Sequence, residues 1–312
     1  MNIFITGACG YVGTVLSKVL ADEGQIVTAF DTQWFGNHLP SHPNINVVKG
    51  DTRDIADHSL DGIDVVIHLA NIANDPAVDL NLNLSWEVNV LATQQLAERA
   101  SRAGVGQFIF ASSGSVYGIK EEMDVTEELE LLPLSAYNKT KMVAERVLLS
   151  YQSKMQVHCI RPATVCGYSP RMRFDVSVNM LTLQALKNKK MTVFGGAQTR
   201  PNIHINDMVR VYQHFLSHPN LPSDCYNAGF ENMAIIDIAE LIGTKIHSDI
   251  EITQTNDLRS YRQNSDKLLS TGFQQKYFVC DAVDEIAALY AAGSLNDDEK
   301  CYTVSWMKKL EV

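Results

Sequence analysis

The sequence contains no block of basic residues and no long apolar run. Its 312 residues include 26 Lys and Arg against 36 Asp and Glu, for a formal net charge of −10. An acidic protein is a poor partner for nucleic acid or an anionic membrane, so we expect it to bind neither. No stretch approaches the roughly 18 apolar residues of a membrane span. The opening, MNIFITGACGYVGTVL, also lacks the basic start of a signal peptide. These absences predict a cytoplasmic protein.

Closely spaced cysteines and metal-binding clusters are missing as well. The six cysteines are scattered, and no pair has the spacing of a zinc or redox motif. The histidines His68, His204 and His214 are not spaced as metal ligands either. We therefore predict reduced cysteines, which pack as small apolar residues, and no metal site.

The first two thirds of the sequence alternate short apolar runs with longer amphipathic ones. Runs such as NIFIT, DVVIHLA and QFIFASS are rich in Val, Ile and Phe, which is typical of parallel strands buried on both faces. Helical patterns cover residues 11–23, 85–103 and 136–154. Repeated strand–helix–strand units predict an α/β fold, a Rossmann-type doubly wound parallel sheet.

Three glycines follow the first predicted strand. Gly7, Gly10 and Gly13 lie where that strand passes into a helix. Glycines at such a place allow a tight turn, close approach of the backbone to a pyrophosphate and close packing of helix on strand. The helix N-terminus adds N–H groups that favour phosphate. The spacing is G-x-x-G-x-x-G rather than G-x-G-x-x-G, and taken alone it also fits a loop that needs positive φ.

The following strand ends strengthen the case for a dinucleotide. Asp31 ends the second strand, where a carboxylate accepts hydrogen bonds from the adenosine ribose. Because it would repel a 2′-phosphate, it favours NAD over NADP. Asp51 ends the third strand and suits the adenine amino group, and Leu69 and Ala70 end the fourth. The ordered set predicts NAD as the cofactor.

A hydroxyl-rich strand end and a tyrosine–lysine pair come next. Ser113 follows the fifth strand, and Tyr137 and Lys141 open the next helix, where positions four apart share one face. A tyrosine hydroxyl has a pKa near 10. A neighbouring ammonium and the charged nicotinamide ring would lower it towards the range of a general base. The spacing alone also fits two ordinary surface-helix residues.

Taken in order, these motifs resemble one family. The glycine motif, Asp31, GDTRD, HLA, SSGSVYG, Tyr137-x-x-x-Lys141, IRP, RPNIHINDM and DLRSYRQNSDK are similar to the extended short-chain dehydrogenases/reductases, in particular the NAD-dependent sugar-nucleotide epimerases and dehydratases (UDP-glucose 4-epimerase-like). The resemblance implies a catalytic centre of Ser113, Tyr137 and Lys141. Tyr137 would move the proton of a sugar hydroxyl, Lys141 would hold the nicotinamide ribose, and Ser113 would bind the reacting oxygen. It also implies a homodimer formed through the helices at 85–103 and 136–154.

The resemblance implies two sets of ligand contacts. The expected NAD contacts are Gly7, Gly10, Tyr11, Val12, Gly13, Asp31, Asp51, Thr52, Leu69, Ala70, Asn89, Tyr137, Lys141 and Pro162. The expected contacts with a nucleoside-diphosphate sugar are Ser113, Thr164, Arg173, Asn179, Arg200 and Arg259. Guanidinium groups suit a diphosphate because they present two parallel donors. For Asn89 an ordinary helix polar residue remains an alternative. Asn71, Asn74, Asp75, Arg171 and Arg173 could reach the sugar nucleotide or equally serve turns and exposed loops.

Departures from the family pattern bear on the reaction. The 4,6-dehydratases carry an Asp–Glu pair where this chain has Gly114 and Ser115, and the UDP-glucuronate decarboxylases tend to carry Glu at the second place. Dehydration and decarboxylation are therefore disfavoured. The leading hypothesis is a 4-epimerase that acts by transient oxidation at C4. The alternatives are a C4 dehydrogenase or 4-ketoreductase of a nucleoside-diphosphate hexose or heptose, and a non-catalytic NAD-binding protein.

The regular alternation stops near residue 165. We predict an NAD-binding domain over residues 1–165, to which later segments return, and a smaller α/β portion over residues 166–312 that mainly binds substrate.

Overall fold

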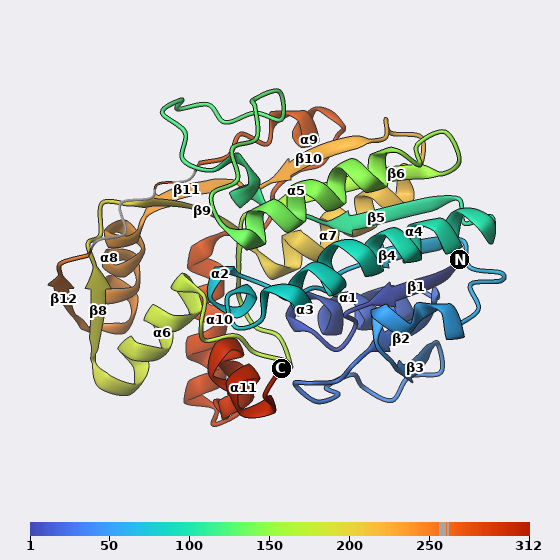
Figure 1. Cartoon of the computed structure of the whole chain (residues 1–312). Helices are drawn as coiled ribbons and strands as arrows, with labels where there is room; N and C mark the ends of the chain where they lie inside the picture. The colour runs from blue at the N-terminus through green and yellow to red at the C-terminus, as the bar shows by residue number, and fades with distance from the viewer. Residues whose placement is uncertain (256–259, 261) are drawn as a thin grey trace.

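The computed structural model describes residues 1–255, 260 and 262–312, and its centre is a sheet of seven strands (Figure 1). All neighbours pair in parallel, in the order β10-β6-β5-β4-β1-β2-β3. The strands are β1 (Asn2–Thr6), β2 (Ile26–Asp31), β3 (Ile45–Lys49), β4 (Val65–His68), β5 (Gln107–Ala111), β6 (Gln156–Pro162) and β10 (Asp224–Ala228). The predicted Rossmann-type parallel sheet is confirmed.

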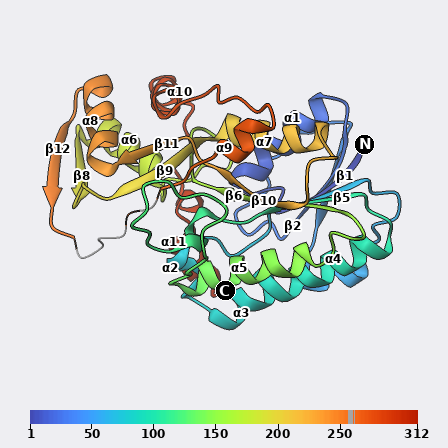
Figure 2. The ribbon, with the colours of Figure 1, turned by 90° about the horizontal axis from the view of Figure 1, so that it is seen from above.

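Helices cover both faces of this sheet (Figure 2). On one face lie α1 (Tyr11–Asp22) and α7 (Ile205–Ser217), and on the other lie α4 (Ala92–Arg102) and α5 (Ala136–Leu149). Successive strand residues point to opposite faces. Ile3 and Ile5 therefore pack into the core under α1 and α7, whereas Phe4 packs into the core under α4 and α5. Burial on both faces explains why these strands are apolar throughout.

The helix predicted at residues 85–103 is interrupted. The chain forms α3 (Leu82–Trp86), then a π-helical turn, η2 (Glu87–Leu91), and only then α4. A π turn adds one residue to the helical repeat and frequently lies at a functional site. Here it carries Asn89, whose side chain is buried. The helix that begins at Ala136 ends at Leu149 rather than at residue 154.

The later part of the chain lies at the carboxyl ends of the large sheet, to the left in Figure 1. It contains a three-stranded sheet of β7 (Thr164–Cys166), β9 (Thr199–His204) and β11 (Glu231–Ala234), and a two-stranded sheet of β8 (Lys190–Phe194) and β12 (Asp249–Thr253). The helices α6 (Ser177–Asn188), α8 (Ile235–Ile246) and α10 (Val279–Ala291) share one apolar core with β7, β8, β11 and β12. By contrast, β10 and α7 return to the large sheet.

Short elements complete the described chain. They are η1 (Thr52–Asp57), α2 (Asp75–Val78), η3 (Gly114–Tyr117), α9 (Asp266–Ser270), η4 (Glu299–Cys301) and α11 (Thr303–Leu310). None of the helices in the described ranges combines the length and the apolar character that crossing a membrane requires.

Candidate active site

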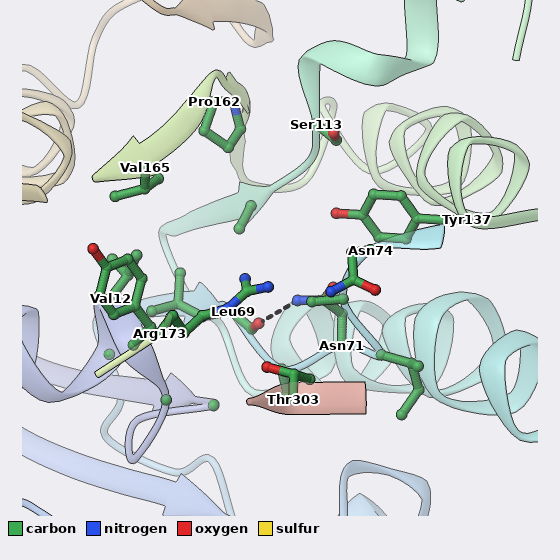
Figure 3. A pocket seen from close by; sticks show the side chains of 18 of the residues that line it. Val12, Leu69, Asn71, Asn74, Ser113, Tyr137, Pro162, Val165, Arg173 and Thr303 are labelled. Carbon is green, nitrogen blue, oxygen red and sulfur yellow. Dashed lines mark hydrogen bonds between the residues drawn. The ribbon is translucent and has the colours of Figure 1, made fainter. Parts of the chain in front are cut away.

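The carboxyl ends of the parallel strands open onto a cavity of about 760 Å³. Ligands of doubly wound sheets bind at this edge. Tyr137 and Ser113 face the cavity from one side, and Arg173 faces it from the later part of the chain (Figure 3). The predicted residues on its wall are Gly7, Gly10, Tyr11, Val12, Gly13, Asp31, Asp51, Thr52, Leu69, Ala70, Ser113, Tyr137, Lys141, Pro162, Thr164, Arg173 and Arg200. The residues left open by the sequence, Asn71, Asn74, Asp75 and Arg171, also line it.

Two predicted contacts lie behind the wall instead. Asn89 accepts a hydrogen bond from Ile72 N–H (2.8 Å) and donates to Ile72 C=O and Thr140 Oγ1 (3.1 Å each). It thus holds the loop after β4 against α5. Asn179 accepts from Gly167 N–H (3.0 Å) and donates to the hydroxyl of Tyr11 (3.0 Å). The predicted contact Arg259 lies outside the described residues.

The glycine turn has no room for side chains. Gly7 has a φ of +71°, and a Cβ there would lie 2.6 Å from Ala70 N. A Cβ on Gly13 would lie 2.2 Å from Gly7 O. Gly10 caps α1 without a side-chain hydrogen bond, so the first N–H groups of the helix remain available to an anion. This cradle fits the pyrophosphate of a dinucleotide.

Asp31 is fixed by the backbone around it. Its carboxylate accepts hydrogen bonds from Cys9 N–H (3.0 Å) and Gln33 N–H (2.6 Å). Burial raises its pKa, while these two bonds and the charge of Arg171 lower it. A carboxylate held at the end of β2 fits a ribose diol. Asp51 also lines the cavity and pairs with Arg53 at 2.8 Å.

The lysine lies beside the tyrosine ring and bonds to the backbone of β5. Lys141 Nζ donates to Ala111 C=O (2.7 Å) and lies 5.9 Å from the centroid of the Tyr137 ring. Burial lowers the pKa of Lys141 to about 7. Burial also raises the pKa of Tyr137 to about 12, and a hydrogen bond with Ser113 and the charge of Arg173 lower it. The charge of Arg173, which the sequence did not associate with the tyrosine, therefore also favours the phenolate.

The two residues at which dehydratases carry an Asp–Glu pair, Gly114 and Ser115, provide no carboxyl group after β5. There is also no space for a carboxyl group at Gly114. A Cβ on Gly114 would lie 2.4 Å from Gln263 Nε2. The Gln263 side chain is held there by a hydrogen bond to Arg161 C=O (2.9 Å). The Asp found at this place in dehydratases would displace it. Ser115 Oγ, at the second position, contacts Ser113 Oγ at 2.8 Å.

The C-terminal helix forms a wall that the sequence did not predict. Thr303, Val304 and Met307 of α11 line the cavity opposite the strand ends. Trp306 Nε1 donates to Trp34 C=O (2.7 Å) and anchors the helix to the segment after β2. The amphipathic pattern of TVSWMKKL is visible in the sequence, but a helical pattern does not identify its packing partner.

Comparisons with known proteins show the family to which the chain belongs. The model of the NAD dependent epimerase/dehydratase family matches residues 3–229. The uncharacterized UDP-glucose epimerase YtcB of Bacillus subtilis is 31% identical over 78% of this chain and 81% of its own length. UDP-glucuronic acid decarboxylase 1 of Xenopus tropicalis is 28% identical over 81% of this chain and 61% of its own length. The structure of MoeE5 in complex with UDP-glucuronic acid and NAD superposes with a TM-score of 0.82 at 26% identity, covering 94% of this chain and 100% of MoeE5.

The chain belongs to the NAD dependent epimerase/dehydratase family. It is an NAD-dependent enzyme of the group that contains sugar-nucleotide epimerases, dehydratases and decarboxylases. The expected family, fold and cofactor are thereby confirmed.

Proposed function

We propose that the protein is a nucleotide-sugar 4-epimerase that uses Ser113, Tyr137 and Lys141. The observation that carries this proposal is the combination of a tyrosine–serine centre with a strand end, Gly114–Ser115, that lacks carboxyl groups. Elimination of water needs an acid and a base beside the redox centre, whereas epimerisation needs only reversible oxidation. Asp75 and Asp175 also line the cavity, but Asp175 is paired with Arg173, and Asp75 by itself does not supply the acid–base pair of a dehydratase.

The protein residues have distinct tasks in this reaction. Bound NAD supplies the acceptor for the hydride that leaves C4 of the sugar. Tyr137 takes the proton of the C4 hydroxyl and returns it when the carbonyl is reduced from its other face. Ser113 hydrogen-bonds the reacting oxygen. Lys141, tied to Ala111 C=O, lies beneath the tyrosine and would hold the nicotinamide ribose.

Two arginines suit the diphosphate of the substrate. Arg173 and Arg200 come from different segments and both line the cavity. Arg173 is oriented by Asp175, which accepts from its Nε at 2.8 Å. Arginine forks bind phosphate oxygens in pairs, so the two could hold the nucleotide while the sugar turns. The similarity to YtcB, named a UDP-glucose epimerase, favours a UDP-hexose.

The test is turnover without added cofactor. The purified enzyme should interconvert C4 epimers within a panel of UDP-, GDP-, CDP- and dTDP-sugars, resolved by NMR. Accumulation of NADH with a keto-sugar would instead identify a net C4 dehydrogenase or ketoreductase. Loss of CO₂ or water would identify a decarboxylase or dehydratase. Tight NAD binding without turnover of any sugar would leave a non-catalytic protein.

A homodimer is part of the proposal. Leu82, Trp86 and Leu91 are large apolar side chains on the α3–η2 segment, and they are exposed by 49%, 37% and 53%. A second copy packed along α3, α4 and α5 would cover them. Light scattering of the wild type should give twice the molecular mass of one chain. Leu91→Glu should reduce the measured mass to that of one chain.

A further inference from the structure

Ser113, Ser115 and Asn138 form a chain of hydrogen bonds beside the reactive tyrosine. Ser113 Oγ lies 2.8 Å from Ser115 Oγ, which lies 2.6 Å from Asn138 Oδ1. Asn138 follows Tyr137 in α5 and is fully buried. Its Nδ2 group has no hydrogen-bond partner among the residues that the structure describes. A buried amide donor without a partner is rare and calls for an explanation.

The hydroxyl protons of this chain all point one way. An amide oxygen only accepts, so Ser115 donates its single proton to Asn138. The 2.6 Å distance is usual for O–H···O and short for N–H···O, which supports this orientation of the amide. Ser113 must then donate its own proton to Ser115. Because Ser113 Oγ also accepts from Ser115 N–H at 3.2 Å, one lone pair remains for a donor from the cavity.

This direction suits a neutral tyrosine and not an ionised one. The neutral Tyr137 hydroxyl can donate to the remaining lone pair of Ser113. A phenolate needs a donor, and Ser113 can donate to it while keeping its hydrogen bond with Ser115 only when every hydroxyl in the chain turns round. That reversal requires a donor at the far end. The unpartnered Nδ2 of Asn138 becomes that donor when the carboxamide rotates by half a turn.

We propose that Asn138 is a positioning residue that acts through Ser115 and switches Ser113 between acceptor and donor as Tyr137 loses and regains its proton. Each hydroxyl keeps one proton throughout, so the chain reorients without carrying a proton to solvent. Arg173, Asp75 and Lys141 are the charged groups around Tyr137, and the switch leaves them in place. Its kinetic consequence rests on the proposed epimerase function, but its effect on tyrosine ionisation does not.

The decisive measurement is the ionisation of Tyr137 in the NAD-bound, full-length protein. An ultraviolet difference titration against Tyr137→Phe isolates this residue from the other tyrosines. Ser115→Ala cuts the chain and frees the Ser113 proton for the phenolate, so the midpoint should fall. Asn138→Asp ends the chain in a carboxylate that only accepts, so the midpoint should rise by about one pH unit or more. Lys139→Arg, an exposed neighbour on the same helix, should not change it.

Opposite shifts distinguish the switch from a packing role. Damage to the site would move both midpoints in the same direction, and that result would overturn the proposal. A direct effect of the introduced charge is tested by combining Asn138→Asp with Ser115→Ala, because the new carboxylate then remains but cannot orient Ser113. The rise should shrink by at least half in the double variant, and an undiminished rise would also overturn the proposal. If Asn138→Asp does not fold, as judged by its melting temperature and NAD affinity, the sign of the Ser115→Ala shift decides.

Turnover supplies a second readout. With a sugar nucleotide that the wild type epimerises, Asn138→Asp should lower kcat about tenfold or more and change KM by less than about threefold, because the chain touches the proton acceptor and not the nucleotide. A change confined to KM would contradict the switch. If the wild type turns over no sugar, the proposed function fails, whereas the titration still tests the switch.

Discussion

Lys141 Nζ donates a 2.7 Å hydrogen bond to the carbonyl oxygen of Ala111, the last residue of β5. This bond ties α5 to the strand end that carries Ser113, so the catalytic hydroxyls of the two elements are held in register. The ammonium lies 4.8 Å from the centroid of the Phe110 ring and is 1% exposed. Burial at that position lowers the pKa of the ammonium group.

The pH dependence of stability should report this buried lysine. The folded-state pKa of about 7 lies below the ordinary value near 10.4. Between these values the unfolded chain binds more protons than the folded one. The loss of folding free energy caused by burying the charged lysine is therefore complete below about pH 7 and is relieved as pH rises. Denaturation of wild type and Lys141→Met from pH 6 to 10 should show the wild type gaining stability relative to the variant. A constant difference would contradict the depressed pKa.

NAD affinity should rise with pH. The charged nicotinamide ring favours the phenolate of Tyr137, and by linkage the phenolate favours the cofactor. Because burial holds the pKa of Tyr137 at about 12 before the cofactor binds, the affinity should still be increasing between pH 8 and 10. The NAD dissociation constant measured across this range should lose that dependence in Tyr137→Phe. The same variant should retain NAD binding and lose turnover by roughly a thousandfold.

Asp31 should decide between the two dinucleotides. Asp31→Asn removes the charge that repels a 2′-phosphate, and its single amide oxygen keeps an acceptor for one of the two N–H groups, Cys9 or Gln33, that bond to different oxygens of the carboxylate. The ratio of the dissociation constants for NADP and NAD, from isothermal titration, should fall by about tenfold or more. An unchanged ratio would mean that the adenosine ribose lies elsewhere.

Arg173 should affect both substrate binding and the tyrosine. Arg173→Gln removes a donor for the diphosphate and the charge that favours the phenolate. We expect KM for the sugar nucleotide to rise about tenfold and the midpoint of Tyr137 ionisation to move upward. Lys187→Gln, a change at an exposed lysine of α6, is the matched control and should change neither.

Much of this site follows from local patterns. The apolar runs of β1, β4 and β5 predict parallel strands because both faces of each strand are buried. Gly7 and Gly13 are recognisable because only glycine fits a turn where any Cβ would meet backbone atoms at 2.6 Å or less. Ser113, Tyr137 and Lys141 are likewise identified by a strand end and a helical spacing. Each of these signals lies within one element or at its junction with the next.

Tertiary structure alone decided what surrounds those residues. The Trp306–Trp34 hydrogen bond brings α11 to the cavity from the other end of the chain, and Gln263 fills the space beside Gly114. The pKa of Tyr137 is raised by burial and lowered by the hydrogen bond with Ser113 and the charge of Arg173, which come from other segments of the chain. Asn138 has a role only because Ser115 lies 2.6 Å from its amide. Contacts between distant segments leave no periodic trace in the sequence, since side-chain volume, burial and hydrogen-bond direction are fixed only when the segments pack together.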